Sequence, residues 1–120
     1  MNIITKALLT TSLTLGLLAG CAQPNPHPMD MTSAIQSAKT KADHEALAEH
    51  YEQAAKEAEA KVEEHKKILS QYEREPWLFG RQATGFGEHC KNLIQIYSRA
   101  MEENLEMAKM HRELAKGIKP

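Results

Sequence analysis

The chain carries six histidines and two cysteines, the residues most suited to binding a metal ion. Imidazole and thiolate are common ligands of zinc and copper in proteins. His44 and His50 flank Glu45, but the spacing H-E-x-x-x-x-H places the two imidazoles on different faces of a helix. The zinc-protease motif needs them four residues apart. The sequence also lacks C-x-x-C-H, the signature of covalent haem attachment. A ligand set must therefore combine residues that are distant in sequence.

Two amphipathic helices would position these residues. Apolar residues recur every three or four positions from about residue 33 to 73, and again from about 88 to 116. Ser33 and Gln36 form a capping-box pattern at the start of the first helix. The many Ala, Glu and Lys residues favour helices over sheets. We therefore predict an all-α fold, a long antiparallel helical hairpin.

One antiparallel register brings candidate ligands together at two levels. It places His44 opposite His111, and it also places His65 opposite Cys90. The same register sets small apolar side chains against large ones along the interface. Facing helices are where helical bundles build their metal sites.

The candidate metal ligands are His44, Met107 and His111 at one end of the hairpin, and His65, His89 and Cys90 near the connector. Met107 precedes His111 by one helical turn, and imidazole with thioether suits copper(I). Zinc, or a haem held by His/Met ligation, fits less well. A half-buried histidine at a helix interface is more often a packing residue than a ligand, and that alternative stays open.

Residues 74–87 interrupt the helical pattern and form the predicted connector. They contain Trp77, Phe79 and Phe86, which are the only tryptophan and phenylalanine residues of the chain. Glycine and proline punctuate the segment. Because large aromatic side chains gain stability by burial, they either close one end of the helical core or contact a partner.

The N-terminal residues have the organisation of an export signal. Residues 1–6 include Lys6, residues 7–18 are apolar or small, and Ala19-Gly20 precede Cys21. A membrane-spanning helix needs about 20 apolar residues, so the apolar run is too short to be a transmembrane anchor. We therefore predict a cleaved signal peptide at residues 1–20.

The motif Leu18-Ala19-Gly20-Cys21 resembles the lipobox of bacterial lipoproteins. This resemblance covers residues 1–21 only. It implies cleavage before Cys21 and acylation of Cys21, with palmitate among its acyl chains. In that family an Asp after the cysteine retains the protein in the inner membrane. Here Ala22 follows, which implies an anchor in the outer membrane that faces the periplasm.

A Pro-rich tether at residues 21–32 would join the lipid to a helical domain at 33–120. Lipidation of Cys21 would leave Cys90 as the single free cysteine in an oxidising compartment. Cys90 is then a buried thiol, half of an intermolecular disulfide, or a metal ligand.

Composition narrows the functional classes. A net charge of −1 argues against nucleic acid as a partner, because phosphate neutralisation needs a basic surface. A narrow, Ala-rich hairpin leaves little room for a catalytic pocket, so we do not expect an enzyme. Its thin core should be marginal in isolation, which predicts a homodimeric four-helix bundle or packing of residues 33–42 as a third piece.

We therefore expect a non-enzymatic, lipid-anchored periplasmic protein that acts as a binding or interaction module at the cell envelope. The alternative is a periplasmic metal-binding protein that uses copper, and less readily zinc or haem.

Overall fold

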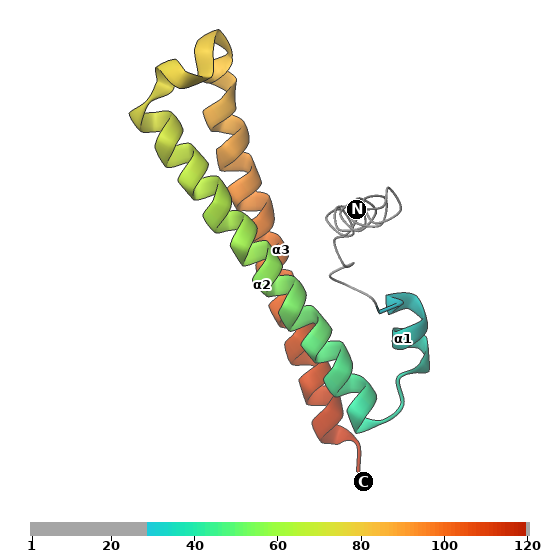
Figure 1. Cartoon of the computed structure of the whole chain (residues 1–120). Helices are drawn as coiled ribbons and strands as arrows, with labels where there is room; N and C mark the ends of the chain where they lie inside the picture. The colour runs from blue at the N-terminus through green and yellow to red at the C-terminus, as the bar shows by residue number, and fades with distance from the viewer. Residues whose placement is uncertain (1–28, 120) are drawn as a thin grey trace, which may run out of the picture.

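The computed structural model describes residues 29–119, which form helices and contain no strand. The segments are α1 (Met31–Ser37), α2 (Lys41–Arg74), a 3₁₀ segment η2 (Pro76–Gln82) and α3 (Ala83–Gly117). Helices α2 and α3 lie side by side and antiparallel, so the predicted all-α hairpin is confirmed (Figure 1). The signal peptide, Cys21 and residues 22–28 of the tether lie outside the described residues.

The hairpin is long and narrow. Helices α2 and α3 contain 34 and 35 residues. At a rise of 1.5 Å per residue, each helix is about 50 Å long. η2 closes one end, which we call the tip, while α1 and the C-terminal turn of α3 lie at the other end (Figure 1). Among the described residues, no helix combines the length and hydropathy needed to cross a bilayer.

The core between the two helices is thin. Among the described residues, six of the nine buried hydrophobic residues are alanines, and Leu47 is the only large side chain that is fully buried. Small side chains let the two helix backbones approach closely, but each buries little apolar area. The structure thus shows the weak core that the sequence predicted, whereas the dimer stays a prediction.

The predicted helix over residues 33–73 is wrong at its start, because two helices replace it. The backbone of Thr40 is extended (φ −106°, ψ 161°), which ends any continuous helix there, and Thr40 caps α2. Its Oγ1 accepts a hydrogen bond from the Asp43 amide at 3.1 Å, and an Asp43 carboxylate oxygen accepts one from the Thr40 amide at 2.8 Å. This reciprocal capping box satisfies amides that have no partner within α2. Asp30, rather than Ser33, caps the preceding helix α1.

The predicted connector over residues 74–87 is too long, and the predicted start of the second helix at 88 is too late. Helix α2 ends at Arg74 and α3 begins at Ala83. Gly80 makes the reversal possible, because its φ of 65° and ψ of −158° lie in a region that is almost restricted to glycine. Gly85, Phe86 and Gly87 belong to the first turns of α3.

Candidate functional site

The predicted juxtaposition of His44 and His111 is present in the structure. His44 lies in the first turn of α2 and His111 lies in the last two turns of α3. Their Nδ1 atoms are 3.1 Å apart, within hydrogen-bonding distance. The ring centroids are 5.3 Å apart with 25° between the planes. The distance between the ring centroids is close to the Nδ1–Nδ1 distance plus the radius of each ring. The two nitrogens therefore lie on the line between the centroids, and the rings meet edge to edge.

The histidine pair is set in an apolar, largely buried environment. His111 is 7% exposed and His44 is half-buried. The ring of Tyr51 lies nearly parallel to that of His111, with centroids 5.7 Å apart and 9° between the planes. Ala108 and Ala115, one turn to either side of His111, are 3% exposed. Burial, followed by the charge of His44, lowers the pKa of His111 below its ordinary value of 6.5.

A cross-helix ion pair adjoins the histidines. The guanidinium of Arg112 donates three hydrogen bonds to the Glu52 carboxylate, at 2.9, 3.0 and 3.1 Å. Such a two-pronged contact fixes the relative position of the two helices as well as attracting them. The Glu52–Arg112 pair thus favours the register that brings His44 and His111 together.

At the level of His65 and Cys90, near the tip, the structure gives His65 an aromatic neighbour. The imidazole of His65 lies parallel to the ring of Tyr97, with centroids 5.7 Å apart and 9° between the planes. Its Nδ1 is buried without a hydrogen-bond partner. Cys90 is a free cysteine that is 4% exposed, while His89 lies on the exposed surface. Within residues 29–119 no three His, Cys, Asp or Glu side chains gather in a way that could hold a metal ion.

The tip separates its aromatic residues into two groups. Tyr72, Phe79 and Phe86 form a cluster, with ring centroids 5.0 to 6.0 Å apart. The cluster lies at the end of the helical core, with Tyr72 and Phe79 half-buried and Phe86 38% exposed. Trp77 and Leu78 are 71% and 57% exposed, so they project into solvent. Trp77 is thus the most exposed of the three aromatic residues predicted to contact a partner, and that contact stays a prediction for all three.

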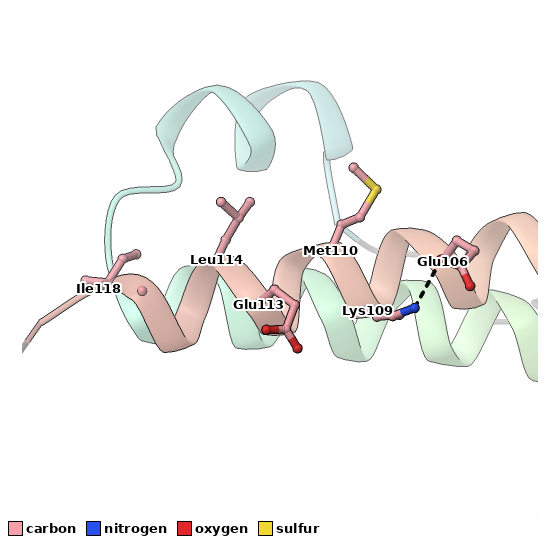
Figure 2. A pocket seen from close by; sticks show the side chains of 7 residues that line it. Glu106, Lys109, Met110, Glu113, Leu114 and Ile118 are labelled. Carbon is pink, nitrogen blue, oxygen red and sulfur yellow. Dashed lines mark ion pairs between the residues drawn. The ribbon is translucent and has the colours of Figure 1, made fainter.

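A second apolar surface lies at the opposite end, on the last turns of α3. Met110, Leu114 and Ile118 follow one another at four-residue spacing and line a shallow depression. In Figure 2 the side chains of Met110, Leu114 and Ile118 project from one side of α3, and that of Glu113 projects from the other. Met110 and Leu114 are 57% and 52% exposed. Met107, one turn earlier, is half-buried.

Sequence reasoning missed several residues of these sites. Tyr51 lies two turns after His44 on the same helix face, and that spacing could have placed it beside the pair. Glu52 and Arg112 match no motif, and only the helix register relates them. Tyr72 joins the tip cluster because it comes level with Phe86, which the predicted connector had kept outside the helix.

No protein family, curated protein or solved structure matches the chain.

Proposed function

We propose that the chain is a non-enzymatic, lipid-anchored protein of the periplasmic face of the outer membrane, and that its tip binds a protein partner. The exposure of Trp77, 71%, next to Leu78, 57%, carries this proposal. Tryptophan is enriched among the residues that dominate binding energy at protein interfaces. An exposed Trp-Leu pair on a well-formed turn can enter an apolar pocket of a partner at little cost in conformational entropy.

The length of the hairpin fits a membrane anchor at one end and a partner contact at the other. The tether would join the chain at the end where α1 and the start of α2 lie, while Trp77 lies at the tip. Helix α2 separates the two by about 50 Å, since a helix rises 1.5 Å per residue. A lipid on Cys21 would then hold one end at the membrane while the other end reaches into the periplasm.

Site-specific photo-crosslinking in cells tests the tip. A photoreactive amino acid at position 78 should give a crosslinked product of defined mass, and Trp77→Ala should abolish that product. Ile96 is the matched control position, because it is 60% exposed but lies well inside α3. Crosslinking that is equal from positions 78 and 96, or that persists in Trp77→Ala, would contradict a tip-specific partner.

The lipid anchor has a separate test. Cys21→Ser should abolish labelling of the chain by radioactive palmitate and release it from the outer-membrane fraction. Cys90→Ser is the matched control, because Cys90 is buried within the hairpin. Membrane association that survives Cys21→Ser would refute the anchor without bearing on the tip.

The thin core supports self-association into a four-helix bundle as the state in which the module works. Sedimentation equilibrium of the detergent-solubilised chain should show a dimer. A cooperatively folded monomer at micromolar concentration would show that one hairpin is stable without a second copy.

A further inference from the structure

We propose that His44 and His111 form a binding site for one copper(I) ion per chain. The site lies at the end of the hairpin opposite the tip, so this inference goes beyond the tip's binding role and does not depend on it. The observation that carries it is the approach of two imidazole Nδ1 atoms to 3.1 Å from two different helices.

The spacing of the two nitrogens fits a shared metal ion. Two nitrogens bound to one ion at about 2.0–2.1 Å lie about 3.3 Å apart at a tetrahedral angle, and about 4 Å apart when the arrangement is linear. The observed 3.1 Å therefore needs to increase by a few tenths of an ångström to about 1 Å. His44 is half-buried in the first turn of α2, where its side chain can make that adjustment without moving α3.

The orientation of the rings also fits. Because the imidazoles meet edge to edge, the Nδ1 lone pair of each ring can point into the space between them. In the metal-free pair one Nδ1 carries the hydrogen of the hydrogen bond. A metal ion needs the lone pairs of both Nδ1 atoms, so the imidazole that carries this hydrogen must hold it on Nε2 instead. The ion thus takes the place of the hydrogen between the Nδ1 atoms of His44 and His111.

The number of ligands favours copper(I) over zinc. A structural zinc site is closed by four ligands. Residues 29–119 gather no group of three or more His, Cys, Asp or Glu side chains, so this part of the chain offers zinc fewer ligands than a closed site needs. Copper(I) accepts low coordination numbers and soft ligands. Met107 lies one turn before His111 and is half-buried, and a long helical side chain such as that of His111 leans back over that turn. The thioether of Met107 is the candidate third ligand.

Anaerobic titration of the detergent-solubilised full chain tests the site, with copper(I) competed against a chromophoric copper(I) chelator. One ion should bind per chain. His44→Gln and His111→Gln should each weaken binding at least tenfold, and Met107→Leu should weaken copper(I) binding by a smaller factor. His89→Gln is the matched control, since His89 is exposed near the tip, and it should bind as the unmodified chain does.

A second measurement covers the case in which a variant folds poorly. In the unmodified, ¹⁵N-labelled chain, copper(I) should shift the Nδ1 resonances of His44 and His111 and leave those of His65 unchanged. Trp77→Ala should bind copper(I) normally, which separates this proposal from the role of the tip. Unchanged binding in the His44→Gln/His111→Gln double variant, or binding that is lost in Cys90→Ser instead, overturns the proposal.

Discussion

The close approach of α3 to Tyr72 makes Gly87 a position where one added methyl group should meet a neighbouring side chain. A Cβ atom added at Gly87 would lie 2.8 Å from Cε1 of Tyr72 and 3.2 Å from Cδ1. The ring has little room to move, because Phe79 and Phe86 pack against it. In a helix, Ala is favoured over Gly by about 1 kcal/mol. Overpacking in a tight core costs about 1–3 kcal/mol. Gly87→Ala should therefore lower the free energy of unfolding by up to about 2 kcal/mol.

Gly85→Ala is the matched control, because a Cβ at Gly85 meets nothing within 4 Å. It should keep the helix-propensity gain, so the two variants should differ by about 1–3 kcal/mol. Urea unfolding followed by circular dichroism at 222 nm measures both. In thermal unfolding, each kcal/mol corresponds to about 4–8 °C for a domain of this size. If Gly87→Ala is as stable as Gly85→Ala, the packing of Tyr72 against α3 is wrong. In a Tyr72→Leu background, Gly87→Ala should cost much less than it does when Tyr72 is present.

Three further predictions concern other parts of the hairpin. Gly80→Ala should lower the free energy of unfolding by about 1–3 kcal/mol, because φ 65° and ψ −158° strain any residue with a Cβ; a variant at least as stable as the unmodified chain contradicts this. Glu52→Gln should lower the free energy of unfolding by at most about 1 kcal/mol, because Glu52 and Arg112 are 40% and 39% exposed. High salt should reduce this loss, and a loss that does not depend on salt would contradict an electrostatic origin. The pKa of His111 is lower in the folded chain than in the unfolded chain, so the unfolded chain binds more protons below pH 6.5. The free energy of unfolding should therefore be highest above pH 6.5 and fall as the pH drops through it. Urea midpoints that depend equally on pH in His111→Gln would assign the effect to another group.

Helical periodicity predicted the hairpin, because apolar spacing reports directly which residues share a helix face. The meeting of His44 with His111 also needed the antiparallel register of the two helices. The break before α2 was missed because apolar spacing continues through it, although Thr40 and Asp43 show the capping pattern that produces it. The start of α3 could not be predicted from local signals. Gly87 reads as a loop residue, and only the contact with Tyr72 explains a glycine inside the helix.

The alanine-rich interface links the weakness of the core to the geometry of the histidine pair. Ala48 and Ala108 lie one turn from His44 and His111, and they are 0% and 3% exposed. Larger side chains there would bury more area, but they would also force the helices apart, since interiors are already close-packed. Two short imidazoles could then no longer come within 3.1 Å of each other. Close approach and a thin core thus have the same cause. Additional stability would have to come from outside the alanine-rich core, either from the half-exposed Glu52–Arg112 pair between the helices or from a second copy of the chain.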